Sequence, residues 1–165
     1  MLGDVPTLQR RLRRTVDQDL AEDLLEAATA TIVEMMGQPW ERDIRTLTLD
    51  GRGRRSLLLP HWPVHDVADV TVDDVPVDVD WSSSGWIVRK SGVFPDRPRS
   101  VVAVVDAGWQ QPPTALVNVA LSMAARAYSN PEQLVTVTLD GRQIRYQPDG
   151  PTAIEQAIIA RHAVR

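Results

Sequence analysis

The sequence predicts an α+β fold that is mainly helical, with a small antiparallel sheet or set of hairpins in the middle. Three observations predict it. Apolar residues recur at helical spacing in residues 1–37 and 113–130, β-branched residues alternate within residues 44–108, and a hairpin followed by a terminal helix fits residues 134–165. Because the chain has 165 residues and neither a repeat nor a low-complexity linker, we expect a single domain over residues 1–165.

The N-terminal region is predicted to form two helices. Thr7 can cap a short helix that runs through Arg14. Asp17 then begins a longer helix, and Gly37 is expected to end it because glycine readily takes the left-handed conformation of a C-terminal cap. Pro39 excludes continuation. The apolar residues that recur at helical spacing in this second helix are Leu20, Leu24, Ala28, Ile32 and Met35, and Ala21, Leu25 and Met36 widen the stripe.

The middle of the chain is strand-like. Residues 44–49 alternate between polar and apolar, and Asp50-Gly51 is a turn signal that leads into an apolar run at 57–59. Further strands are expected at residues 67–79, 86–88 and 101–105. The acidic residues between the valines indicate a mostly antiparallel sheet with one face in solvent.

A third long helix is predicted over residues 114–129, after two prolines. Its polar residues Asn118, Ser122 and Arg126 form one narrow stripe, so the helix should be buried on most sides. Periodicity leaves two interpretations open: part of this helix contacts another subunit, or it is a central core helix within the monomer.

The C-terminal segment is predicted to be a hairpin and a short helix. Strands are expected at residues 134–139 and 143–146, around an Asp140-Gly141 turn. Pro151 is expected at an early position of the terminal helix. The residues that mark one face of this helix are Ile154, Ala157, Ile158 and Arg161.

Composition gives no global sign of affinity for nucleic acid, because the net charge is -4. The absence of cysteine excludes disulfides and thiolate metal sites. No apolar run reaches membrane-spanning length, and the first residues do not resemble a signal peptide. We therefore expect a cytoplasmic or virion-resident protein with no membrane partner.

Candidate metal sites are weak. His61 and His65 have the H-x3-H spacing of a helical metal pair, but Pro63 between them disfavours a helix. A group of acidic residues lacks the loop spacing and glycine of an EF-hand, and alternation places several of its members on the solvent face of strands: Asp73, Asp74, Asp78 and Asp80. We expect neither a metal nor a cofactor.

Catalytic signals are equally weak. Ser82 to Ser84 have no G-x-S-x-G context, and the three histidines show no evident triad partners. Carboxylate pairs lie at helix starts and on strand faces. We therefore predict that the protein is not an enzyme.

Two other groups of residues suit contacts with a partner. Residues 51–55, GRGRR, lack the remaining glycines of a dinucleotide fingerprint, so they are either a solvated turn or a cationic tip that touches phosphate. The arginines at 10, 11, 13 and 14 are either a solvated helix face or a partner contact. Trp62 and Trp109 lie in turn contexts and are candidate interface anchors, although tryptophan also anchors cores and loops.

The order of several structural motifs resembles the head-to-tail adaptor (connector) family of tailed bacteriophages. The helical region ends in a Met-Gly-Gln-Pro-Trp break at residues 36–40. An L-P-x-x-P-V-x-x-V-x-x-V phrase begins at Leu59, and a later strand ends in Gly108-Trp109. A proline-led helix then carries A-A-R-A-Y-x-N-P at residues 124–131.

This resemblance implies a structural neck protein. Such subunits form a ring, commonly a dodecamer, beneath the portal protein; the ring extends the DNA channel and joins the DNA-filled head to the tail. Its neighbours would be the portal and the next neck or tail-completion protein, and genomic DNA would pass without sequence-specific binding. The location would be the virion neck, with assembly in the host cytoplasm. The alternatives are a neck or tail-completion protein at another level, or an unrelated prophage-encoded binding module.

The resemblance also implies roles for regions: residues 114–128 in subunit packing and residues 151–165 in docking. The candidate subunit or partner contacts are Trp62, Trp109, Leu116, Ala120, Ala124, Tyr128, Ile154, Ile158 and Arg161. The candidate channel-facing loop carries Arg52, Arg54 and Arg55.

Overall fold

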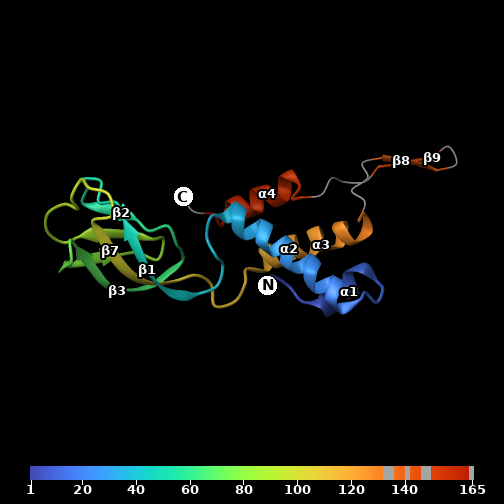
Figure 1. The fold of residues 1–165 in the computed structure, drawn as a ribbon, viewed down its shortest axis with the longest axis horizontal. Coiled ribbons are helices and arrows are strands. Elements are labelled where there is room, and N and C mark those ends of the chain that lie inside the picture. Colours follow the sequence, from blue (N-terminus) through green and yellow to red (C-terminus); the bar gives the residue numbers. More distant parts are fainter. Residues whose placement is uncertain (132–135, 140–141, 146–149, 164–165) are drawn as a thin grey trace. The chain divides into compact units, whose positions relative to one another are not determined.

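The computed structural model describes residues 1–131, 136–139, 142–145 and 150–163. They form two compact units, each described by itself below. The helical unit comprises Met1–Gly37 and Pro112–Ala163, and the β unit comprises Gln38–Gln111 (Figure 1). The expectation of a single adaptor domain over residues 1–165 stays a prediction.

The fold is a true α+β mixture, and the prediction that it is mainly helical is wrong. The described elements are four helices and nine strands, and the strands form three antiparallel sheets. Two causes explain the error. The β-branched segments form long strands, nine residues in β3 and seven in β7, whereas the first and last helices have only eight residues each.

The helical unit contains α1 Val5–Leu12, α2 Gln18–Met36, α3 Thr114–Ser129 and α4 Ala153–Ala160. The predicted bounds of the long helices are confirmed. Asp17 caps α2 by accepting a hydrogen bond from the backbone N–H of Leu20 (3.1 Å), and Gly37 ends it in the left-handed region with φ 68°. Asn130, before a proline, ends α3.

The two short helices begin differently from the prediction. Asp4, not Thr7, caps α1, because its carboxylate accepts from the Thr7 backbone N–H at 2.8 Å. Thr152 caps α4 in a capping box with Glu155, so Pro151 precedes the cap instead of lying inside the helix. In both helices, a side-chain oxygen close to the helix start accepts a hydrogen bond from a free backbone N–H, and the residue that carries this oxygen is the cap.

Apolar residues of α1, α2 and α3 form one core in the helical unit. Its buried members are Leu8, Val16, Ala21, Leu25, Leu121 and Ala124. Ala21, Leu25, Ala28, Ile32 and Met36 line the buried face of α2 at helical spacing. All five belong to the predicted stripe, whereas two other members of that stripe, Leu20 and Met35, are exposed.

The β unit contains seven strands: β1 Asp43–Leu49, β2 Ser56–Leu58, β3 Val64–Val72, β4 Val75–Pro76, β5 Val79–Trp81, β6 Trp86–Arg89 and β7 Val101–Ala107. They form one sheet in the order β1-β7-β3-β4 and a second in the order β2-β6-β5. Both sheets contribute to one core, since Leu57 and Ile87 of the smaller sheet join Val70 and Val101 of the larger, together with the fully buried Phe94.

Strand β7 is the centre of the larger sheet, pairing antiparallel with β1 on one side and β3 on the other. Its odd positions are buried and its even positions half-buried, as alternation predicts. The Asp50-Gly51 turn does not join two paired strands, because β1 pairs with β7 and β2 pairs with β6.

Strands β8 Thr136–Leu139 and β9 Arg142–Arg145 pair antiparallel, as in the predicted hairpin. The predicted Asp140-Gly141 turn and the outer ends of the predicted strands, at 134–135 and 146, lie outside the described residues. Within the part of the chain that the structure describes, no helix is both long enough and apolar enough to cross a membrane.

Candidate functional site

The predicted arginine loop joins β1 to β2 and exposes Arg52, Arg54 and Arg55. Its path depends on glycine at position 51. A Cβ atom there would lie 1.9 Å from the carbonyl oxygen of Pro95, which no side chain can tolerate. Arg52 and Gly53 then both take positive φ, 57° and 61°, to reverse the chain. The loop is therefore built against a second segment and does not move as a free turn.

That second segment runs from Arg89, the last residue of β6, through the loop to residue 100, just before β7. The backbone N–H of Gly51 donates to the carbonyl of Arg97 (3.0 Å), and that of Phe94 donates to the carbonyl of Arg54 (2.8 Å). Arg55 donates from its guanidinium to the carbonyls of Arg89 (3.0 Å) and Lys90 (3.2 Å). We call residues 50–56 and 89–100 together the two-loop clasp.

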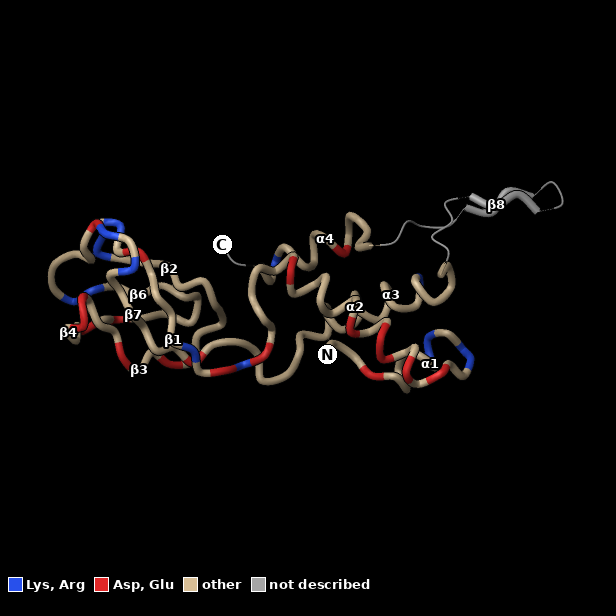
Figure 2. Tube along the Cα trace, viewed as in Figure 1, with Lys and Arg blue, Asp and Glu red and all other residues tan. Residues whose placement is uncertain are grey.

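The two-loop clasp is strongly basic. It carries seven basic side chains against two acidic ones, Asp50 and Asp96. Figure 2 shows basic residues gathered at the loop that leads into β2. Sequence reasoning found only three of the seven, and it missed Arg89, Lys90, Arg97 and Arg99. These four residues lie in the segment RKSGVFPDRPR, which its glycine and prolines mark as a loop. Only the tertiary structure brings this loop close to GRGRR.

Two of these cations are already paired with acids outside the clasp. Arg97 forms an ion pair with Asp73, and Lys90 lies 3.7 Å from Asp80. Asp50 is occupied as well, since its carboxylate accepts the backbone N–H of Arg99 at 2.8 Å. Arg52 and Arg54 carry no such partner among the described residues, so they are the guanidinium groups best placed to meet an anion.

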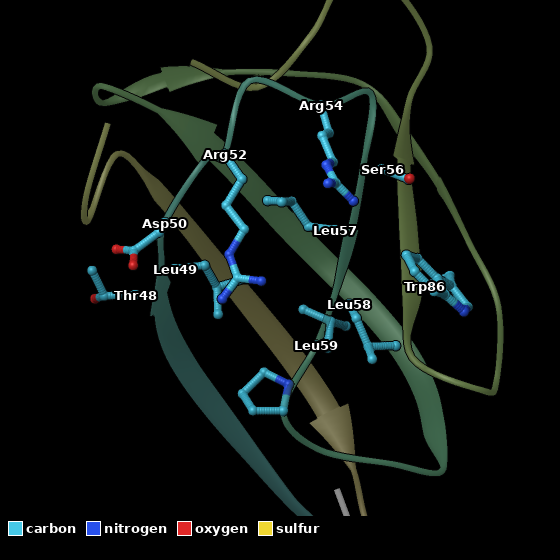
Figure 3. A pocket seen from close by; sticks show the side chains of 11 residues that line it. Thr48, Leu49, Asp50, Arg52, Arg54, Ser56, Leu57, Leu58, Leu59 and Trp86 are labelled. Carbon is cyan, nitrogen blue, oxygen red and sulfur yellow. The ribbon is translucent and has the colours of Figure 1, made fainter. Parts of the chain in front are cut away.

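Arg52 and Arg54 line a hollow of about 480 Å³ between the end of β1 and strand β2. Figure 3 shows both side chains extending from the loop beside the leucines of β2, with Trp86 on the neighbouring strand. The hollow thus combines two guanidinium groups with apolar walls. Guanidinium binds phosphate oxygens in a bidentate manner, so the arrangement suits an anion contact and offers no evident proton-transfer pair.

The two predicted tryptophan anchors contact each other. Trp62 and Trp109 stack edge to face, with ring centroids 5.2 Å apart and an interplanar angle of 67°. The backbone N–H of Trp62 donates to the side-chain oxygen of the buried Gln38 (2.9 Å), and the backbone N–H of Trp109 donates to the carbonyl of Trp40 (2.8 Å). Both rings are half-buried in the β unit, so bracing of loops is one role they fill.

The two histidines of the H-x3-H spacing do not form a metal pair. His65 lies with its Nε2 2.8 Å from the carbonyl oxygen of Gly108. Burial, together with the charge of Arg45, lowers the pKa of His61 below its ordinary value. Among the residues that the structure describes, no three histidine, aspartate or glutamate side chains come together as a metal site would require.

The candidate contacts on α3 are mostly core residues. Leu116, Ala120 and Ala124 are at most 1% exposed, which matches the core-helix interpretation. Tyr128 is half-buried, with the guanidinium of Arg14 5.4 Å from its ring centroid. A second subunit therefore cannot reach the first three residues while the helical unit stays folded.

The residues that mark one face of α4 lie mostly in solvent, and their role in docking stays a prediction. Ile154 is 75% exposed, Ala157 and Arg161 are also exposed, and Ile158 is half-buried. The helix instead buries Ile159 and Glu155. Sequence periodicity missed this face because one of its two buried residues carries a charge.

An ion pair explains that orientation. Arg126 on α3 donates to both carboxylate oxygens of Glu155 at 2.9 and 2.7 Å, and to the carbonyl of Gly150 at 2.9 Å. Burial alone would raise the pKa of Glu155, but the hydrogen bonds from Arg126 and Thr152 outweigh it and hold the pKa below its ordinary value. Glu155 is therefore a charged anchor between α4 and α3.

Comparison with known proteins gives matches among solved structures; no protein-family model and no curated protein matches the chain. A chain from the neck of the empty gene transfer agent (GTA) particle, in a structure computed with C6 symmetry, is 18% identical. Its TM-score is 0.61 over 99% of this chain and 90% of that chain. A chain from the virion of the native GTA particle gives 0.60 at 18% identity, over 99% and 90%.

A third match comes from the neck of the native GTA particle computed with C12 symmetry. Its TM-score is 0.57 at 20% identity, over 95% of this chain and 88% of that chain. The chain shares their fold. The resemblance to phage neck proteins that the order of motifs predicts is thus confirmed at the level of the fold.

Proposed function

We propose that the protein is a structural, non-enzymatic neck protein that joins the DNA-filled head of a phage-like particle to its tail. The observation that carries this proposal is the extent of the fold match. It covers nearly the whole chain and about nine-tenths of chains from GTA necks and virions, so both the helical unit and the β unit take part in the match. The order of sequence motifs points to the same family independently.

In this role the chain forms a ring in the virion. Support comes from the two GTA necks, which were computed with C6 and C12 symmetry. We propose twelve copies, stacked beneath the portal protein and above the next neck or tail-completion protein. Assembly takes place in the host cytoplasm before the ring becomes part of the particle.

The two-loop clasp is the proposed channel-facing element, a role that extends the prediction for Arg52, Arg54 and Arg55. Exposed guanidinium groups contact phosphates of any sequence, and each such contact weakens with salt. Because Arg97 and Lys90 of the clasp are paired with neighbouring acids, the contact stays weak enough for DNA to move past it.

The exposed side of α4 is the proposed docking surface for another neck component. Ile154 is the most exposed of the large apolar side chains in the described residues, and Arg161 lies two turns further along the helix. Trp62, Trp109, Tyr128 and Ile158 remain candidate contacts, since each is half-buried. Leu116, Ala120 and Ala124 leave this set because they are core residues.

The test is electron microscopy of lysates from a phage or prophage that carries a nonsense mutation in this gene. We expect separate full-length tails beside tailless heads, some of which have lost their DNA. A plasmid that supplies the intact chain should restore joined particles. Normal virions in the mutant lysate would overturn the proposal and favour the unrelated binding module.

A further inference from the structure

One side of α2 has no partner among the described residues of the helical unit. Four exposed carboxylates lie along it: Asp19, Asp23, Glu26 and Glu34. Their successive spacings of four, three and eight residues keep them on one side of the helix. This side lies opposite the buried residues Ala21, Leu25, Ala28 and Ile32. It is bordered by two exposed apolar side chains, Leu20 (46%) and Met35 (41%). We call these six residues the outer face of α2.

The charge of the outer face is not balanced locally. Helix α2 contains no lysine or arginine. Of the ion pairs formed between described residues, none involves any of the four carboxylates. The outer face therefore carries four negative charges that a partner with positive charge can neutralise.

A second surface of the same unit carries the opposite charge. Arg10, Arg11, Arg13 and Arg14 lie at the end of α1, all exposed, and we call them the arginine end of α1. Arg11 reaches α3, donating to the carbonyl of Asn118 (3.2 Å) and the hydroxyl of Ser122 (2.6 Å). None of the four arginines forms an ion pair with a described residue.

The two surfaces point to different sides of the helical unit. The outer face of α2 is directed away from the core that α2 shares with α3. Arg11 and Arg14 instead reach over α3, to Ser122 and to the ring of Tyr128. A molecule with complementary surfaces on two sides makes a head-to-tail contact with its own copies, and repetition of such a contact closes a ring or continues as a filament.

We propose that the outer face of α2 binds the arginine end of α1 in a second copy of this chain. The role of this contact as the ring interface rests on the proposed function, but the contact itself does not. Four carboxylates face four arginines, and guanidinium is the cation that fits carboxylate in bidentate pairs. Nucleic acid cannot occupy the outer face, because carboxylates repel phosphates.

The test uses two charge-reversed forms of the full chain. The acid-reversed form carries Asp23→Lys and Glu26→Lys, and the arginine-reversed form carries Arg10→Glu and Arg13→Glu. All four positions are exposed, so both forms should keep the circular dichroism of the native chain. In each form alone, one of the two surfaces has no net charge, so the attraction between copies is lost; in an equimolar mixture, a contact between the two forms can join opposite charges again.

Sedimentation velocity at equal total concentration supplies the readout. We expect the mixture to associate at least tenfold more tightly than either form alone, and high salt to abolish the difference. The matched control reverses two exposed acids of the β unit, Asp74→Lys and Asp78→Lys, and should behave as the native chain does. A mixture that associates no better than its separate components overturns the inference, as does unchanged self-association of both reversed forms.

The outcome separates this inference from the neck role. If mixing fails while a nonsense mutant still accumulates unjoined heads and tails, the neck role stands and the interface lies elsewhere. If mixing succeeds while normal virions form without the chain, the contact between copies stands and the neck role fails.

Discussion

Replacing Glu155 by glutamine is expected to loosen α4 from α3 and to destabilise the helical unit. The substitution keeps the shape of the side chain and an oxygen that can still accept the Thr152 N–H of the capping box, which lies at 2.7 Å in the native chain. It removes the charge that Arg126 contacts with two hydrogen bonds. The Nε of Arg126 already has no hydrogen-bond partner among the described residues, and the substitution would leave a second N–H donor of the same guanidinium without an acceptor.

The magnitude follows from burial. A fully buried ion pair that loses one partner costs about 3–5 kcal/mol, and an exposed pair about 0–1 kcal/mol. The side chains of Arg126 and Glu155 are 20% and 11% exposed, so solvent screens the pair in part. We expect a loss of about 2 kcal/mol, which for a unit of this size lowers the Tm by roughly 10 °C.

The assay exploits a separation of probes between the two units. All five tryptophans lie in the β unit, at positions 40, 62, 81, 86 and 109. The described helices all lie in the helical unit. Far-ultraviolet circular dichroism therefore follows the helical unit, and tryptophan fluorescence follows the β unit. Glu155→Gln should shift the dichroism transition in urea and leave the fluorescence transition in place.

The control is Glu26→Gln, which removes an exposed carboxylate from the middle of α2 and should change stability by less than about 0.5 kcal/mol. An unchanged dichroism transition in Glu155→Gln would refute the claim that the ion pair anchors α4. Equal shifts of both transitions would refute the independent unfolding of the two units.

The same pair makes the helical unit sensitive to acid. Because the pKa of Glu155 lies below its ordinary value of 4.5, the unfolded chain binds the proton more tightly than the folded one. The stabilisation is therefore complete above that value and is lost as pH falls through the lower, folded-state pKa. The stability difference between the native chain and Glu155→Gln should shrink over that window.

Three further substitutions test the packing. Ala124→Arg places a charge in a site that is 1% exposed and should cost about 4 kcal/mol or more, abolishing the dichroism transition while the fluorescence transition survives. Gly51→Ala drives a Cβ into the Pro95 carbonyl and should lower the fluorescence-detected stability by about 3 kcal/mol. Arg55→Lys keeps the charge but loses two hydrogen bonds of the clasp, so it should cost about 1 kcal/mol by the same measurement, whereas Arg52→Lys should be neutral.

The features that the sequence predicts well depend on neighbours in the chain. Asp17 and Gly37 mark the ends of α2 because a short carboxylate and a residue without Cβ satisfy the free groups of the adjacent turns. The bounds of α3 follow from Pro113 before the helix and from Asn130, which precedes a proline, although Pro113 makes no side-chain cap. Alternation placed β7 because the period of a strand does not depend on its partner, whereas the strand predicted over residues 67–79 is divided among β3, β4 and β5.

The features that it misses depend on residues far apart in the chain. The pairing of β1 with β7 brings Asp43 opposite Ala107, and no local signal specifies that choice. The Arg126–Glu155 pair spans 29 residues and turns α4 away from the face that hydrophobicity alone predicts. The second half of the two-loop clasp was missed for the same reason, since its cations meet the first half only after the sheets form.

The net charge of -4 conceals two local excesses that suit two different tasks. In the helical unit, acids and arginines occupy separate sides, a pattern that favours contact between identical copies. In the β unit, basic side chains outnumber acidic ones in the two-loop clasp, a pattern that repels an identical copy and attracts phosphate. Both proposed contacts would weaken with salt, but only a contact with DNA would release condensed counterions, so its affinity would fall as a power of the salt concentration. Salt titration of ring assembly and of DNA binding would therefore separate the two surfaces without any substitution.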